Sequence, residues 1–227
     1  MSSSKLPGLG LALVLVALAS VAPSSARGDE AVMCKAQEEP CLEENTYPVE
    51  TKFSAQWAME LGVIFETSLW KTRCVEASLE GVSTALTGGE ITSLSFPKCV
   101  PLQETPIHCN AAKAINLPYG VAFITNEENS EGLEANRMRM SSGGGGDPGF
   151  KFDCEMGGFK FWCAYTRESL DMGLVGGEPA EMRANYGLLK LTGSSSLTPL
   201  CTTSSDEMAW YAQLELGTPS PLFFSGL

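Results

Sequence analysis

Apolar and polar side chains alternate in several segments of this chain, so that every second residue is apolar. Such alternation predicts antiparallel β-strands with one buried face and one solvated face. In the segment that begins at Met182, the phase of the alternation changes near Gly187, which indicates a β-bulge. The alternating segments cover residues 115–123, 150–156, 159–165, 182–188 and 208–216.

Glycine-rich turn signals separate these segments, among them residues 193–196 and the run 143–146, which we interpret as a hairpin loop. Short strands with regular glycine turns predict an all-β fold, an antiparallel β-sandwich or flattened barrel of about eight to ten strands. Residues 52–69 fit two descriptions. Their β-branched and aromatic residues favour a pair of strands, whereas apolar residues near helical spacing leave a helix open.

The N-terminus has the composition of a secretory signal peptide. Lys5 supplies a positive charge, residues 9–21 are apolar apart from Ser20, and small residues precede a cleavage site after Ala26. The apolar run is shorter than the roughly 20 residues that span a bilayer, so we expect a secreted or cell-wall-associated product without a membrane span. The predicted organisation is a signal peptide at 1–26, a polar N-terminal extension at 27–50 and a single β domain at 51–227.

The charge balance narrows the range of partners. The chain carries 15 Lys and Arg against 27 Asp and Glu, which gives a formal net charge of -12. A surface this acidic repels phosphate backbones, so nucleic acid is excluded as a partner.

All eight cysteines lie downstream of the predicted signal peptide, which favours disulfides formed in an oxidising compartment. Sequence alone does not fix their connectivity. Short loops favour two of the bridges, and a turn centred near residues 158–159 would place Cys154 opposite Cys163. The last bridge follows by elimination. The predicted bridges are Cys34–Cys41, Cys74–Cys201, Cys99–Cys109 and Cys154–Cys163.

Few residues carry catalytic or metal-binding patterns. The single histidine, His108, lies beside Cys109 in a proline-bounded segment, and we interpret it as an exposed loop residue rather than a general base. Because the chain has a single histidine and no Cys-x-x-Cys pair, we expect no metal site. It also lacks the Gly-x-Ser-x-Gly and His-Glu-x-x-His motifs, and we expect no catalytic residue and no cofactor. The oxygen-rich segment 126–131 could bind calcium, but a solvated acidic turn is the interpretation that we favour.

Trp162 is the best candidate for a ligand-binding residue. It lies out of phase with Phe161 and Cys163, so its side chain is expected on the opposite face of the strand. An exposed indole there would mark a binding surface, whereas a second sheet or the N-terminal extension could instead cover it.

Several short motifs extend over nearly the whole chain after the signal peptide. They are Cys34-Lys-Ala-Gln-Glu-Glu-Pro-Cys41, Asn45-Thr46-Tyr47-Pro48, Gly89-Glu-Ile-Thr-Ser-Leu-Ser-Phe96 before Cys99, Asn116-Leu-Pro-Tyr119 and Thr218-Pro-Ser-Pro-Leu-Phe223. In this combination the chain resembles a family of small exported, cysteine-containing, β-rich proteins from high-GC Gram-positive bacteria, the actinobacteria. The resemblance implies a shared fold and shared bridges. It transfers no catalytic residue, because the family has no assigned activity.

These observations favour a non-enzymatic exported protein that contacts the cell envelope or another extracellular partner. One alternative is a carbohydrate or small-ligand binding module that uses Trp162 as a platform. A second alternative is an unrecognised hydrolase with paired carboxylates on a concave sheet face.

Overall fold

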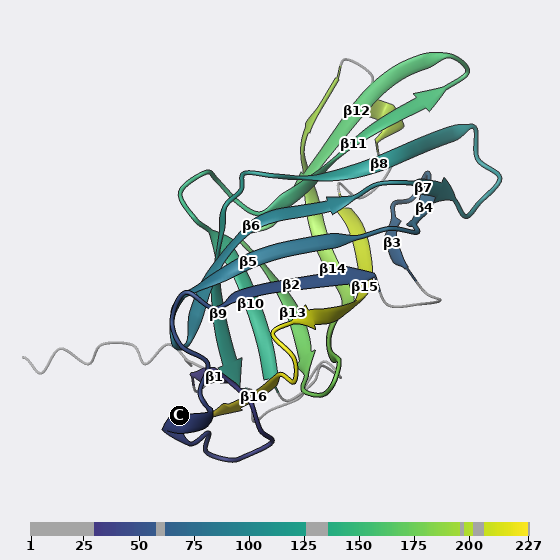
Figure 1. Cartoon of the computed structure of the whole chain (residues 1–227). Coiled ribbons are helices and arrows are strands. Elements are labelled where there is room, and N and C mark those ends of the chain that lie inside the picture. Colours follow the sequence, from purple (N-terminus) through teal and green to yellow (C-terminus); the bar gives the residue numbers. More distant parts are fainter. Residues whose placement is uncertain (1–29, 58–61, 126–135, 196–197, 202–206, 227) are drawn as a thin grey trace, which may run out of the picture.

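The computed structural model describes residues 30–57, 62–125, 136–195, 198–201 and 207–226, which form sixteen strands and two short 3-10 turns (Figure 1). The 3-10 turns are η1 (Glu43–Asn45) and η2 (Thr198–Leu200). The described part of the chain contains no α-helix, so the all-β prediction is confirmed. The strands are β1 (Ala31–Cys34), β2 (Lys52–Trp57), β3 (Val63–Glu66), β4 (Lys71–Cys74), β5 (Ser78–Ala85), β6 (Gly88–Phe96), β7 (Cys99–Pro101), β8 (Ile107–Ile115), β9 (Tyr119–Thr125), β10 (Asn136–Ser142), β11 (Gly149–Met156), β12 (Phe159–Thr166), β13 (Ser169–Val175), β14 (Ala180–Ser194), β15 (Glu207–Thr218) and β16 (Phe223–Gly226).

One part of the sheet closes on itself, and we call it the lower barrel. Its strands follow the antiparallel order β15, β2, β5, β6, β9, β10, β13 and β14, and β14 pairs again with β15. Closure gives each of these strands a hydrogen-bonded neighbour on both sides. The small β1–β16 sheet lies at its lower end (Figure 1).

The remaining strands form the upper lobe, which consists of β3, β4, β7, β8, β11 and β12. It shares three long strands with the lower barrel, because each of them changes partner along its length. β6 passes from β9 to β8, β14 from β13 to β12, and β15 from β3 to β2. In Figure 1, β8, β11 and β12 extend beyond the lower barrel, and the strand order ends at β7.

The interior is filled by side chains from the alternating segments. In the upper part, the ring of Phe65 packs within 6.5 Å of four other aromatic rings, which belong to Phe96, Phe150, Phe152 and Trp210. At the lower end, Met33 of β1 and Phe224 of β16 contribute to the same apolar cluster as Phe53 and Phe123. The segment predicted as a polar extension therefore contributes a buried strand to the core.

Several local expectations can be compared with the structure. The predicted bulge is confirmed, because the register between β14 and β15 shifts between Ala184 and Gly187. Residues 52–57 and 63–66 are strands rather than a helix, but both pair with β15 instead of with each other.

Two connections differ from the sequence interpretation. The alternating segment 115–123 is split into β8 and β9 at Asn116, whose φ of 65° turns the chain. The glycine run 143–146 is not a hairpin loop, because β10 and β11 are not neighbours in the sheet. It instead crosses from the lower barrel to the upper lobe, where the Asn116 amide donates a 2.7 Å hydrogen bond to the Asp147 carbonyl.

The disulfides confirm one predicted bridge and correct three. Cys34–Cys41 forms as expected. The pairings Cys74–Cys201, Cys99–Cys109 and Cys154–Cys163 were wrong. The structure instead joins Cys74 to Cys99, Cys109 to Cys154 and Cys163 to Cys201.

The turn between β11 and β12 explains the main error. The turn is centred on Gly157 and Gly158, which have φ values of 57° and 86°, so Cys154 lies opposite Phe161. A turn centred one residue later would have placed Cys154 opposite Cys163. Instead, Cys154 pairs with Cys109 on β8, and Cys99 on β7 lies opposite Cys74 on β4.

The predicted signal peptide and the acidic segment 126–131 lie outside the described residues, so both stay predictions. Within the described ranges, no helix is long and apolar enough to cross a bilayer.

Candidate functional site

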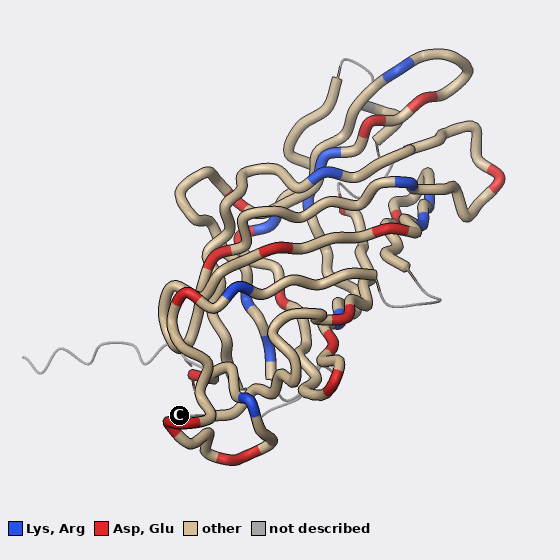
Figure 2. Tube along the Cα trace, viewed as in Figure 1, with Lys and Arg blue, Asp and Glu red and all other residues tan. Residues whose placement is uncertain are grey.

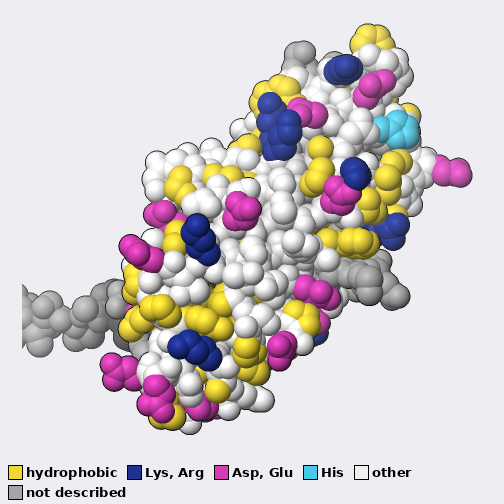
Figure 3. All heavy atoms as spheres, in the orientation of Figure 1, with side chains coloured by type: hydrophobic (Ala, Val, Ile, Leu, Met, Phe, Trp, Pro, Cys, Tyr) yellow, Lys and Arg dark blue, Asp and Glu magenta, His cyan; other side chains and the backbone are white. Residues whose placement is uncertain are grey.

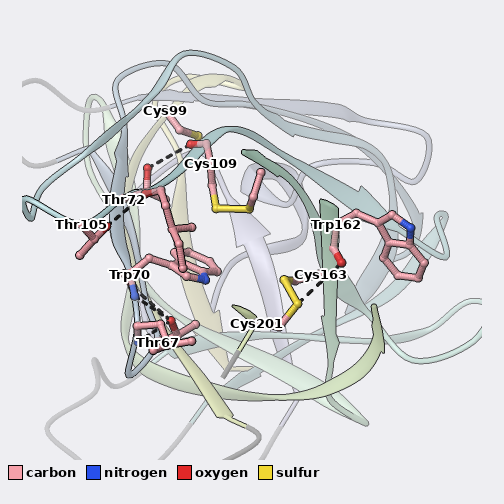
Figure 4. The surroundings of a disulfide bond; sticks show 12 residues. Thr67, Trp70, Thr72, Cys99, Thr105, Cys109, Trp162, Cys163 and Cys201 are labelled. Atoms are coloured by element: carbon pink, nitrogen blue, oxygen red, sulfur yellow. Dashed lines mark hydrogen bonds between the residues drawn. A yellow bond between two sulfur atoms is a disulfide. The ribbon is translucent and has the colours of Figure 1, made fainter. Parts of the chain in front are cut away.

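Trp162 lies on the outer face of β12, as its phase predicted. Its neighbours Phe161 and Cys163 point inward and are buried, whereas Trp162 is half-buried. Figure 4 shows the indole directed away from the bridge between Cys163 and Cys201. The Cys201 sulfur lies 3.7 Å from the Trp162 carbonyl oxygen, and the Ser195 amide donates to that oxygen at 3.1 Å. The backbone beneath the indole is therefore held on two sides.

A hollow of about 420 Å³ lies beside the indole, and we call it the Trp162 groove. Its polar lining comes from three strands and the end of a fourth. The lining residues used below are Asn110, Asp153, Glu155, Lys160, Trp162 and Ser195.

Two local features of the sheet shape this groove. The register between β8 and β11 shifts between Asp153 and Cys154, so Asn110 is left without a partner residue opposite it. On β14, Gly193 leaves room for the indole, since a Cβ atom there would make a tight contact of 3.1 Å with Trp162 Cζ3. Gly193 was interpreted as a turn signal, but it lies within β14.

Charges of both signs surround the indole. The Lys151 ammonium lies 4.8 Å from the centre of the Trp162 ring, which is cation–π geometry. Lys113 lies 3.6 Å from the Asp153 carboxylate, and both side chains are exposed, so this pair adds little stability. Figure 2 shows basic and acidic residues interspersed on β8, β11 and β12. In Figure 3, acidic side chains instead gather at the lower end of the molecule.

The residues expected to lack catalytic roles are placed as follows. His108 is exposed, but it lies in β8 opposite Glu155 rather than in a loop. Its neighbour Cys109 is oxidised in a bridge and cannot serve as a nucleophile. Among the described residues, no group of three or more metal-binding side chains comes together.

The groove also contains two carboxylates. Asp153 and Glu155 are two residues apart on β11 and line the same hollow. Two residues of strand span about 7 Å. Both acidic side chains therefore enter the hollow from neighbouring outward positions of one strand.

Sequence reasoning found Trp162 but missed its supporting residues. Lys151 could have been found from its position in the strand, because it lies on the same face of β11 as Asp153. Asn110 and Ser195 had no comparable signal, since they enter the groove through a bulge and a long-range strand pairing.

Comparisons with known proteins give no further assignment, because no family model, no curated protein and no solved structure matches this chain.

Proposed function

We propose that this chain is an exported, non-enzymatic protein that contacts a cell-envelope polymer or another extracellular protein through the Trp162 groove. Four disulfides support export, because such bridges persist in oxidising compartments. The resemblance to exported actinobacterial proteins agrees with the proposal and stays a prediction.

The observation that carries the proposal is the half-buried indole beside an open groove. Because the backbone of Trp162 is held in place, its side chain has little rotamer freedom to lose on binding. The indole also offers a large apolar face to a partner. Lys151 and Asp153 place a cation and an anion beside this face, so a partner can be oriented by hydrogen bonds. Aromatic anchors with a polar rim are typical of protein binding sites.

Cosedimentation with an insoluble cell-wall preparation tests the proposal. The wild-type protein should sediment with the walls, and Trp162→Ala should lose most of that binding. Phe159→Ala is the matched control, because Phe159 is 69% exposed on the same strand and does not line the groove. Protease treatment of the walls then separates a polymer partner from a protein partner. Equal binding by Trp162→Ala and wild type would contradict the proposal.

The two groove carboxylates support a second candidate function, a glycoside hydrolase. Asp153 and Glu155 lie on one face of one strand beside an aromatic residue, and most glycoside hydrolases use a pair of acidic side chains. Turnover of a glycoside that disappears in both Asp153→Asn and Glu155→Gln would establish this alternative and overturn the non-enzymatic proposal. Binding without turnover would favour the binding protein.

A further inference from the structure

A second hollow, of about 350 Å³, lies on the outer face of the sheet where the lower barrel meets the upper lobe. β15 exchanges β3 for β2 at this place, and β14 bulges opposite the exchange. The hollow therefore arises from an interruption of both neighbours of β15. Its lining includes Ile64, Glu66, Lys71, Arg183, Asn185 and Tyr211.

Tyr211 forms the aromatic side of this hollow, and the exposed ring of Tyr186 lies next to Tyr211. The rings of Tyr186 and Tyr211 lie 5.6 Å apart, and Tyr186 is 59% exposed. Tyr186 has a φ of 56°, a left-handed backbone conformation that bulky side chains rarely adopt. Strained backbone of this kind is concentrated at functional sites. This backbone conformation directs the Tyr186 ring into solvent beside the hollow. Burial of the ring therefore does not offset the cost of the strained backbone.

The charged groups of the hollow are already paired. Lys71 lies 2.8 Å from the Glu66 carboxylate. Arg183 donates to Glu181 at 2.7 Å, and the Gln213 amide donates to the same oxygen at 3.1 Å. Because each cation has its own carboxylate, the site offers no net charge to an ionic ligand.

Hydrogen-bonding groups remain available around this neutral site. Asn185 is exposed, and its amide carries two donors and an acceptor. Burial, followed by the nearby Glu66 carboxylate, raises the pKa of Tyr211. Its hydroxyl keeps its proton at neutral pH, as a tyrosine normally does, and can act as a donor.

We propose that this hollow is a binding site for a neutral saccharide, with Tyr211 as the aromatic platform and the neighbouring Tyr186 ring at its margin. A sugar ring presents C–H groups to an aromatic face and hydroxyls to amides and paired charges, which matches the lining described above. The volume is at the lower end of the range for ligand sites, which suits a mono- or disaccharide unit. The inference is independent of the Trp162 groove, because the two hollows share none of the residues that line them.

Titration calorimetry with neutral oligosaccharides tests the inference. The probes are chito-, cello-, malto- and galacto-oligosaccharides, with a sulfated counterpart of each binder. We expect at least one neutral probe to bind. Tyr186→Gly and Tyr211→Ala should each weaken it about tenfold, the loss expected for one aromatic contact. Glycine tolerates the backbone conformation of Tyr186, so a loss in Tyr186→Gly cannot be attributed to unfolding.

Trp162→Ala and Phe159→Ala are the matched controls, and both should bind the saccharide as the wild type does. Binding lost in Trp162→Ala but kept in both tyrosine variants would move the saccharide to the Trp162 groove and overturn the inference. No binding of any neutral probe, or tighter binding of the sulfated form, would also overturn it. Cell-wall binding through Trp162 would stand in each of these cases.

Discussion

The lower barrel and the upper lobe are stabilised in different ways. Hydrogen-bonded ladders close the lower barrel, and its only described disulfide, Cys34–Cys41, lies in the segment beneath it. The upper lobe contains three bridges, and its strand order ends at the short strand β7. The comparison shows that the disulfides are concentrated in the part of the sheet that does not close into a barrel.

Side-chain contacts reinforce the bridges of the upper lobe. The hydroxyl of Thr72 on β4 lies 3.0 Å from the Val100 carbonyl on β7. It also lies 3.3 Å from the Cys109 carbonyl on β8 (Figure 4). A free strand edge exposes unpaired backbone groups and can pair with other chains. Bridges and buried hydroxyls hold such strands in place when a ladder does not.

Removing a disulfide of the upper lobe should lower the free energy of unfolding more than the other substitutions described below. Cys163 and Cys201 are 38 residues apart, so replacing both by serine should lower the free energy of unfolding by about 4 kcal/mol. The Cys34–Cys41 pair, 7 residues apart, is the matched control and should cost about 2 kcal/mol. Denaturant unfolding gives both values.

Hydrogen exchange locates the same effect. Amide protection should fall first in β11 and β12 of the Cys163→Ser, Cys201→Ser variant, while β10 and β13 keep theirs. An equal fall in both regions would show that the two are one cooperative unit.

The lower barrel should depend on apolar packing instead. Phe224 is buried at its lower end, where its ring lies 5.7 Å from that of Phe123. Phe224→Ala should lower the free energy of unfolding by about 3 kcal/mol through the cavity that it leaves. Thermal unfolding checks the magnitude. Loss of amide protection confined to the upper lobe would contradict the assignment of Phe224 to the lower barrel.

Tyr119 connects the two regions through its hydroxyl, which should make stability fall at high pH. The hydroxyl donates towards the carbonyls of Ile115 at 2.7 Å and Gly149 at 2.9 Å. Burial raises the pKa of Tyr119 from 10.0 to about 12.

The stability from this shift is complete below pH 10 and is lost as the pH rises towards 12. The loss should be about 2 kcal/mol, measured as denaturant unfolding across this range. Tyr119→Phe should flatten the profile and cost about 1 kcal/mol at neutral pH. An unchanged profile in Tyr119→Phe would contradict the assignment.

Replacing Tyr186 should change the free energy of unfolding the least, and this change should be stabilising. Tyr186→Gly relieves a left-handed backbone conformation, so the free energy of unfolding should rise by about 1 kcal/mol. Tyr186→Ala is the control, because alanine removes the ring but keeps the strain. Equal stability of the two variants would show that the backbone at the bulge is not strained.

Local patterns predicted the strands and the side-chain faces well. The alternation at 208–216 places Trp210 and its even-numbered neighbours in the core, and the phase of Trp162 placed it outside. These predictions depend only on the two-residue period of a strand.

Long-range pairing could not be predicted in the same way. The bridge Cys109–Cys154 depends on β8 lying beside β11, and the hollow near Tyr211 depends on β15 changing partner. A shift of one residue in the centre of the turn at Gly157 was enough to assign a wrong bridge to Cys154. The residues around each cysteine do not indicate which strands become neighbours in the sheet.

The bridge between Cys163 and Cys201 has a consequence for the indole on its outer side. Oxidation links the residue after Trp162 to a distant part of the chain, so folding orients the aromatic face before any partner arrives. In the binding that we propose, the indole would then need little additional ordering, so the entropy lost on association would be small.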